Sequence, residues 1–330
     1  MPQPLVDGLP DKTVLELLRQ FPGAHPAVKA TEEMLASSIT GISSQFRENA
    51  EVYDERYFNA GTKREVIERA IKAIGAKFDA DQRLSVLDVG CGSGNASFGA
   101  LALFPNAQIH ATDMSPELLS ILALRAEKAG LLSQFNLFVS DASTVKLAGA
   151  AFDLVIGSSM VHHLVDAEGF MIRILESVRA RGVAIFFEPF QAGHAVVRQI
   201  LATLVRLSAA YGGVSPKRIK FFKDYIFTIS TMLREDRDDP IFAKIDDKWM
   251  FTKSIFERVA ANTGTRLDIF ATNPSVGAFR NKVTDLLWQG LGDRDPLPDW
   301  ALEVLDEADA NIGIELRQEL LMEGCIVFGR

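Results

Sequence analysis

LSVLDVGCGSGN, at residues 84–95, decides the fold of this chain. It reads as a buried strand that runs into a turn in which Gly90, Gly92 and Gly94 occupy alternate positions. Glycine has no Cβ, so such a turn can bend sharply and let a ligand approach the main chain. The helix that follows would present its N-terminal amides to the same ligand. The pattern therefore predicts a strand, a binding turn and a helix.

Two acids flank this turn in the expected fold. A second strand, Ala107 to Thr112, is followed by Asp113, which can accept two hydrogen bonds from a ribose diol. Asp88 precedes the turn, where it would repel a pyrophosphate but attract an ammonium or sulfonium centre. A dinucleotide fingerprint needs a third glycine where this chain has Asn95 or Ser97. The spacing favours a cofactor that carries a cation over a dinucleotide.

The run Val86 to Gly94, followed by Asp113, resembles the cofactor site of class I S-adenosylmethionine-dependent methyltransferases. In that family an apolar residue at the position of Met114 packs against the adenine ring, and an acid at Asp141 caps the adenine amino group. Core packing for Met114 and a turn or helix cap for Asp141 are the alternatives. The resemblance implies that S-adenosylmethionine is bound by Tyr57, Asp88, Gly90, Gly92, Gly94, Asp113, Met114, Asp141, Ala142 and Ser158.

Tyr57 belongs to an aromatic segment, Phe46 to Phe58, that is similar to one closing over the cofactor in many of these enzymes. Aromatic residues are also common where a terminal helix packs on a core. The segment is therefore predicted to be a lid or to attach the N-terminal helices to the core.

Composition describes an ordinary globular chain. Hydrophobic residues make up 48% of its 330 residues, and the net charge of −8 offers little attraction to nucleic acid. Cys91 and Cys325 are the only cysteines, so neither a disulfide framework nor a cysteine metal site is indicated. No apolar run reaches the about 18 residues of a membrane helix. We expect a soluble, cytoplasmic protein without a nucleic-acid or membrane partner, and the sequence leaves a homodimer open.

Strands alternate with helices between residues 84 and 190, which predicts parallel pairing with right-handed crossovers. Two more strands follow, Arg266 to Ala271 and Gly324 to Gly329, and in the resembling fold this last pair is a hairpin with one strand antiparallel. The predicted fold is α/β: a Rossmann-like, mostly parallel seven-stranded sheet with helices on both faces. Its expected parts are a helical N-terminal segment or lid (1–60), the S-adenosylmethionine-binding core (61–192), a helical cap insertion (193–250), and the remaining core (251–330) with a second helical insertion at about 276–323.

The expected reaction is methyl transfer to a small-molecule acceptor, with oxygen as the first choice of atom. The cap insertions would supply an acceptor pocket with apolar walls. His163 and Glu188 are the candidate catalytic bases, since removal of a proton is the main chemical task left to the protein. His162 and His163 are adjacent, and neighbouring residues at a helix start point about 100° apart, which argues against a shared metal. No metal is predicted.

Three other functions remain open at this stage. A phenylalanine-rich chamber with one carboxylate could stabilise a cationic intermediate, as in C-methylation of an apolar or prenyl- or polyketide-like acceptor. An NAD-dependent oxidoreductase would share the strand, turn, helix and ribose acid but lacks its third glycine here. A non-catalytic cofactor-binding protein would keep Asp88 and Asp113 without turnover.

Overall fold

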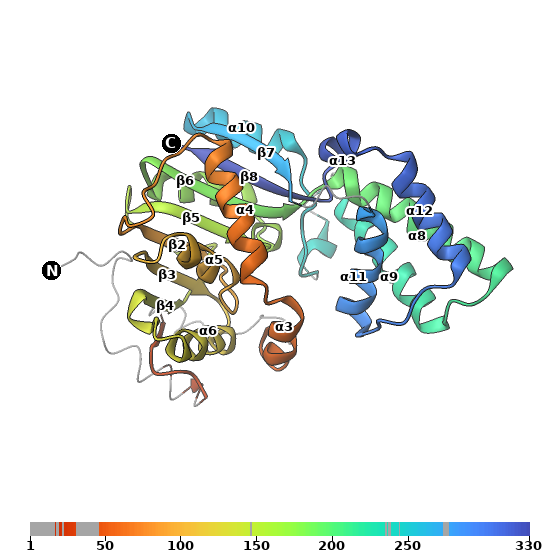
Figure 1. Ribbon diagram of the computed structural model, residues 1–330, viewed down its shortest axis with the longest axis horizontal. Coiled ribbons are helices and arrows are strands. Elements are labelled where there is room, and N and C mark those ends of the chain that lie inside the picture. The colour runs from red at the N-terminus through yellow and green to blue at the C-terminus, as the bar shows by residue number, and fades with distance from the viewer. Residues whose placement is uncertain are drawn as a thin grey trace. The chain divides into compact units, whose positions relative to one another are not determined.

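The computed structural model describes residues 17, 20–21, 23–30, 46–145, 147–234, 236, 239–243, 245–272 and 277–330. The chain divides into two compact units (Figure 1). Unit 1 comprises Met1–Phe187, Ser254–Asp268 and Cys325–Arg330, and unit 2 comprises Glu188–Lys253 and Ile269–Gly324. Most of the predicted N-terminal helical segment lies outside the described residues.

An eight-stranded sheet with the order β1-β4-β3-β2-β5-β6-β8-β7 forms the framework of unit 1. Apolar runs buried on both faces produce its central strands, as parallel sheets require. The pairs β1·β4, β4·β3, β3·β2, β2·β5 and β5·β6 are all parallel. The strands are β1 (Val28–Ala30), β2 (Ser85–Val89), β3 (Gln108–Asp113), β4 (Phe135–Val139), β5 (Phe152–Ser158), β6 (Val178–Pro189), β7 (Arg266–Ala271) and β8 (Glu323–Gly329).

Strand β8 runs antiparallel to β6. The Arg330 amide donates to the Gly182 carbonyl in the first half of β6, whereas the Phe190 amide, just after β6, donates to the Met322 carbonyl just before β8. The Rossmann-like prediction is confirmed, with one strand more than the seven expected. The additional strand is β1, whose three residues are too few to show an alternating pattern in the sequence.

Six helices of the described residues belong wholly or mainly to unit 1. A Cβ on Gly99 of α5 would lie 2.9 Å from the backbone nitrogen of Arg64 in α4, so this glycine lets the two helices pack closely. Figure 1 shows α4 and α5 crossing the same face of the sheet. The helices are α3 (Ala50–Tyr57), α4 (Ala60–Ala73), α5 (Asn95–Leu103), α6 (Pro116–Lys128), α7 (Ala167–Ser177) and α10 (Lys253–Thr263), with short 3-10 turns η2 (Leu132–Gln134) and η3 (Val161–His163).

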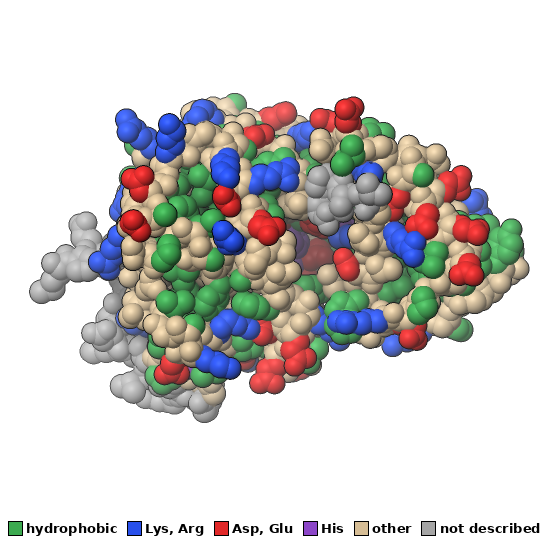
Figure 2. Space-filling model, viewed as in Figure 1, with side chains coloured by type: hydrophobic (Ala, Val, Ile, Leu, Met, Phe, Trp, Pro, Cys, Tyr) green, Lys and Arg blue, Asp and Glu red, His purple; other side chains and the backbone are tan. Residues whose placement is uncertain are grey.

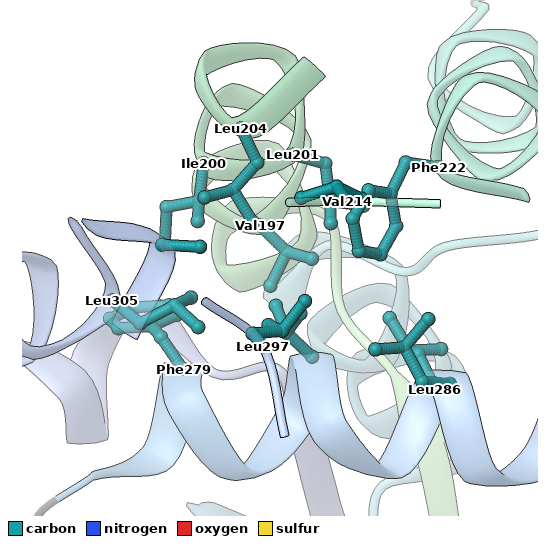
Figure 3. Packing of buried hydrophobic residues seen from close by; sticks show 13 residues of the cluster. Val197, Ile200, Leu201, Leu204, Val214, Phe222, Phe279, Leu286, Leu297 and Leu305 are labelled. Carbon is teal, nitrogen blue, oxygen red and sulfur yellow. The ribbon is translucent and has the colours of Figure 1, made fainter. Parts of the chain in front are cut away.

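Unit 2 is helical, and its core is apolar (Figure 3). Val197, Ile200, Leu201 and Leu204 recur at helical spacing on α8 and are buried against residues of α9, α11 and α12. The second insertion was expected to be helical, and its described residues form three helices. The elements are α8 (Gln191–Tyr211), α9 (Pro216–Met232), η4 (Pro240–Ala243), α11 (Ala278–Leu291), α12 (Asp299–Asn311) and α13 (Ile314–Leu320).

Figure 2 shows acidic and basic side chains interspersed among the described residues of one face. None of the helices in the described ranges is both long enough and apolar enough to cross a bilayer.

Candidate functional site

The glycine turn after β2 requires glycine at all three predicted positions. Gly90, Gly92 and Gly94 have φ of +64°, +54° and +98°, in the left-handed region where other residues are strained. A Cβ on Gly90 would lie 2.7 Å from Met160 Cβ, and one on Gly94 would lie 2.9 Å from Leu122 Cγ. A Cβ on Gly92 would meet no atom within 4 Å. Gly92 therefore faces open space, which gives a ligand access to the main chain.

Asp113, the last residue of β3, holds this turn in place. Its Oδ2 accepts a hydrogen bond from the Gly92 amide, and its Oδ1 accepts one from the Ser115 amide, each at 2.8 Å. Burial raises the pKa of Asp113, and its hydrogen bonds with backbone amides partly offset that effect. Each carboxylate oxygen has a second lone pair. Asp113 can thus fix the turn and still accept hydrogen bonds from a diol.

Asp88, near the end of β2, is fully buried. Its Oδ2 accepts a hydrogen bond from the Ser97 hydroxyl at 2.6 Å, while its Oδ1 has no hydrogen-bond partner among the described residues. Burial raises the pKa of Asp88 from 3.8 to about 6. A buried carboxylate oxygen without a partner is costly, and a cationic ligand would relieve that cost. In the sequence, Ser97 was noted only because it occupies a position where a dinucleotide fingerprint has glycine. In the structure, it is the hydrogen-bond donor to Asp88.

Lys63 of α4 is a site residue that the sequence did not indicate. Its Nζ donates to the Ser158 hydroxyl at 2.7 Å and lies 4.2 Å from the centre of the Phe187 ring. Ser158 ends β5, and Phe187 lies opposite it on β6. The close packing of α4 on Gly99 brings the side chain to the ends of these strands.

Arg125 of α6 joins the segment before α4 to the glycine turn. Its Nη2 donates to Asp54 Oδ2 and its Nη1 to the Ser93 carbonyl, each at 2.7 Å. Its guanidinium carbon lies 3.5 Å from the centre of the Phe58 ring. Asp54 Oδ1 is buried without a hydrogen-bond partner in the described parts of the chain. Arg125 thus fixes α3 against the turn.

A second contact reinforces this attachment. The Asn95 side chain, at the first position of α5, donates to the Tyr57 carbonyl at 2.9 Å and accepts from the Asn59 amide. The Tyr57 ring lies 4.5 Å from the Tyr53 ring, centre to centre. The aromatic segment is therefore fastened to the binding turn at two points. Its predicted contact with a cofactor through Tyr57 stays a prediction.

The predicted adenine-binding residues follow β3 and β4, which are adjacent strands. Met114, Asp141 and Ala142 are all half-buried. Asp141 Oδ1 accepts a hydrogen bond from the Ser143 amide at 2.8 Å, which is the turn arrangement considered as the alternative. The turn leaves Asp141 Oδ2 outside that contact. Its proposed contact with an adenine amino group remains a prediction.

The two histidines do not diverge as the helical spacing suggested. The rings of His162 and His163, in η3, have centres 4.1 Å apart and planes inclined by 44°. Side-chain torsions bring the rings together although the Cβ directions differ. His163 also meets the Phe46 ring edge-on, with centres 6.2 Å apart. Sequence spacing by itself therefore does not exclude a shared ligand for this pair.

Glu188, the other candidate base, is the penultimate residue of β6 and is fully buried. It belongs to unit 2, whereas His163 belongs to unit 1. The phenylalanines expected around an acceptor differ in burial: Phe186, Phe187, Phe190 and Phe222 are buried, Phe221 is half-buried, and 59% of Phe227 is exposed. Phe222 is part of the apolar core of unit 2, so it packs inside that unit instead of lining an acceptor chamber.

Residues 86–182 match a family model described as a methyltransferase domain. Aklanonic acid methyltransferase DauC of Streptomyces sp. is 34% identical over 116 residues, which cover 33% of this chain and 50% of DauC. A ubiquinone biosynthesis O-methyltransferase of Cereibacter sphaeroides is 29% identical over 119 residues, covering 34% of this chain and 47% of that protein. The chain thus spans about half the length of these relatives.

The fold has solved counterparts. A Haemonchus contortus phosphoethanolamine N-methyltransferase 2, solved with S-adenosyl-L-methionine, superposes with a TM-score of 0.50 at 15% identity, covering 88% of this chain and 60% of that one. At this identity the similarity concerns the fold. The matched methyltransferase domain confirms the resemblance on which the sequence interpretation rested.

Proposed function

We propose that this protein, which carries a class I S-adenosylmethionine-dependent methyltransferase domain, methylates a small-molecule acceptor, with oxygen as the first choice of atom. The observation that carries the proposal is Asp88. A fully buried carboxylate with an unpartnered oxygen, next to a glycine turn that faces open space, suits a nucleoside-type cofactor with a cationic amino-acid end.

Different residues of the site would contact different parts of the cofactor. Asp88 would bind the ammonium group, the open main chain at Gly92 would lie along the ligand, and Asp113 would accept the ribose hydroxyls. Met114 and Asp141 would hold the adenine. When bound, S-adenosylmethionine supplies a methyl group on a sulfonium centre that leaves readily. The protein must then orient the acceptor, exclude water and remove a proton where the acceptor carries one.

His163 and Glu188 are the proposed bases. His163 is half-buried and packs edge-on against Phe46, which restricts its ring. Glu188 is fully buried at the end of the strand next to the one that carries Ser158. C-methylation of an apolar or prenyl- or polyketide-like acceptor is the alternative. The names of the relatives, an aklanonic acid methyltransferase and a ubiquinone biosynthesis O-methyltransferase, support a small-molecule acceptor.

Calorimetry tests the proposed function. S-adenosylmethionine and S-adenosylhomocysteine should bind, and NAD should not. Incubation with candidate phenols and acids, followed by mass spectrometry, would then identify a product that is heavier by one methylene and the atom that carries it. Tight binding of NAD with no binding of S-adenosylmethionine would contradict the proposal. Cofactor binding without turnover of any acceptor would support the non-catalytic alternative instead.

A further inference from the structure

Unit 2 contains a cavity of about 480 Å³ that the cofactor site does not use. Its wall is mainly apolar and includes Phe190, Ala195, Leu233, Phe251 and Leu321. The volume lies within the range of about 300–1,000 Å³ that is typical of small-molecule sites. The predominance of apolar side chains favours an apolar ligand, since burying one there removes apolar surface from water.

Main-chain hydrogen bonds fix this cavity. The Gln191 amide donates to the Phe251 carbonyl at 2.9 Å, and the Phe251 amide donates to the Pro189 carbonyl at 2.8 Å. On the other side, the Gly193 amide donates to the Leu321 carbonyl at 2.9 Å. A Cβ on Gly193 would lie 2.4 Å from that carbonyl oxygen, so glycine is required there. The walls are therefore held in position before any ligand binds.

Leu321 is an independent sign of function in this wall. It has φ of +46° and ψ of 112°, a conformation that a leucine rarely adopts, and it is the C-cap residue that follows α13. Its side chain is 1% exposed. Strained backbone of this kind concentrates at ligand sites. The strain positions the Leu321 carbonyl for the hydrogen bond from Gly193.

One side of the cavity carries an ion pair. Lys253 and Glu319 both line the cavity, and Lys253 donates to Glu319 Oε2 at 2.8 Å. The Glu319 side chain is 74% exposed, so this ion pair is weak and a ligand anion can replace Glu319. The N-terminus of α8, at Gln191, also lines the cavity, and a helix N-terminus favours negative charge.

We propose that this cavity is the acceptor site and that the acceptor is an apolar molecule with one anionic group, a carboxylate or a phenolate, held by Lys253. The inference rests on the proposed function, since it assigns the acceptor class to that reaction. The apolar walls would hold the carbon skeleton, and Lys253 would select for the charge.

Two fluorescent dyes of similar size test the charge and the cavity separately. 8-Anilinonaphthalene-1-sulfonate is apolar with one anion, and N-phenyl-1-naphthylamine is its neutral counterpart. Lys253→Met should weaken binding of the anionic dye about threefold to fivefold and leave the neutral dye unchanged. Lys220→Met is the matched control, because Lys220 forms a similar exposed ion pair with Asp224 on the same unit.

Ala195→Trp should fill the cavity and weaken binding of both dyes at least about tenfold. Gln199→Trp, one turn further along α8 at an exposed position, should leave both unchanged. Thermal unfolding would show that each variant is folded. Equal dye affinity in Ala195→Trp and Gln199→Trp, or an equal effect of Lys253→Met on both dyes, would overturn the proposal.

Measurements with S-adenosylmethionine separate this inference from the proposed function. If both are correct, Ala195→Trp should raise the KM for an acidic acceptor at least about tenfold, with cofactor affinity within about twofold. Normal turnover and acceptor KM in Ala195→Trp would overturn the acceptor site and leave the methyltransferase intact. Absence of S-adenosylmethionine binding in the wild-type protein would overturn the proposed function, whatever the dyes show.

Discussion

Each unit contains an arginine that joins segments distant in the sequence, and the two arginines differ in the groups that they bind. Arg218 in unit 2 binds Asp293 through Nε and Nη2, both at 2.7 Å, and donates to the carbonyls of Asp295 and Pro296. Arg125 in unit 1 binds one oxygen of Asp54 and a carbonyl of the glycine turn. Arg218 thus attaches a loop to the helical core of unit 2, whereas Arg125 attaches α3 to the glycine turn.

The difference teaches how to distinguish a structural contact from a functional one. Arg218 uses both oxygens of its acid and holds the pKa of Asp293 down at about 2. In unit 1, Asp54 and Asp88 each keep one buried oxygen without a hydrogen-bond partner among the described residues. Buried polar groups whose hydrogen bonds are all made within the protein stabilise the fold. Buried polar groups that lack a hydrogen-bond partner indicate where a ligand could supply one.

The largest expected effect concerns which unit supplies the base. In single-turnover measurements, His163→Ala in unit 1 or Glu188→Gln in unit 2 should slow methyl transfer by about 10²–10⁴-fold, the usual value of general-base assistance. Affinity for S-adenosylmethionine should stay within about twofold for the same variant. Near-normal rates in both variants would mean that alignment alone carries catalysis.

Asp113 should be the most sensitive cofactor-binding position. Asp113→Ala removes the expected ribose acceptor and the anchor of the Gly92 amide, and hydrogen bonds to a charged group contribute about 1.5–3 kcal/mol. Calorimetry should show S-adenosylmethionine affinity lower by about 10–150-fold. Asp113→Asn, which keeps one acceptor oxygen, should lose less. Equal affinity in the wild type and Asp113→Ala would exclude this residue from the cofactor site.

The two arginines provide the direct test of the comparison. Arg218→Met should lower the free energy of unfolding by about 3 kcal/mol, because it leaves a partly buried acid unpaired. Its effect on cofactor affinity should be negligible. Arg125→Met should instead weaken S-adenosylmethionine binding about tenfold, since it releases α3 and the Ser93 carbonyl. Denaturant titration and calorimetry measure the two quantities, and Arg125→Lys should partly restore binding. If Arg125→Met lowers only the free energy of unfolding and leaves cofactor affinity unchanged, Arg125 would have a structural role like that of Arg218.

At neutral pH the buried Asp88 carboxylate should lower the free energy of unfolding, although it serves S-adenosylmethionine binding. Its pKa is 3.8 when unfolded and about 6 when folded, so the folded state holds the proton more tightly. The resulting stabilisation is complete below pH 3.8 and disappears as pH rises through 6, a change on the order of 3 kcal/mol. Asp88→Asn should therefore flatten this fall in denaturant titrations at pH 4 to 7, while weakening S-adenosylmethionine binding. An unchanged pH dependence would contradict the assigned pKa.

A chelator should have the smallest effect. We expect turnover to continue in EDTA, because the sequence gives no cysteine or carboxylate motif for a metal. The adjacent rings of His162 and His163 make this measurement necessary. Complete loss of turnover in EDTA, with recovery on addition of a divalent cation, would show that the histidines or other residues hold a metal and would replace the metal-free mechanism.

The sequence by itself determined the central strands, the glycine turn and the acids beside it. These features depend on local rules: alternate glycines permit positive φ, and an acid at a strand end lies at the same edge as its neighbours. Predicted and observed bounds differ by one residue at each end of β3 and at the start of β8, and β7 agrees at both ends. The three-residue strand β1 had no such signal.

Tertiary structure alone decided which distant residues support the site. Arg125 and Asp54 are separated by 71 positions, and Lys63 and Ser158 by 95. No periodicity relates such residues, because their contacts arise when helices pack on the sheet, as α4 does at Gly99. The same holds for Phe222 and Phe227, alike in sequence but buried and exposed in the fold. Local spacing sets the backbone, whereas packing between elements chooses the partners of each side chain.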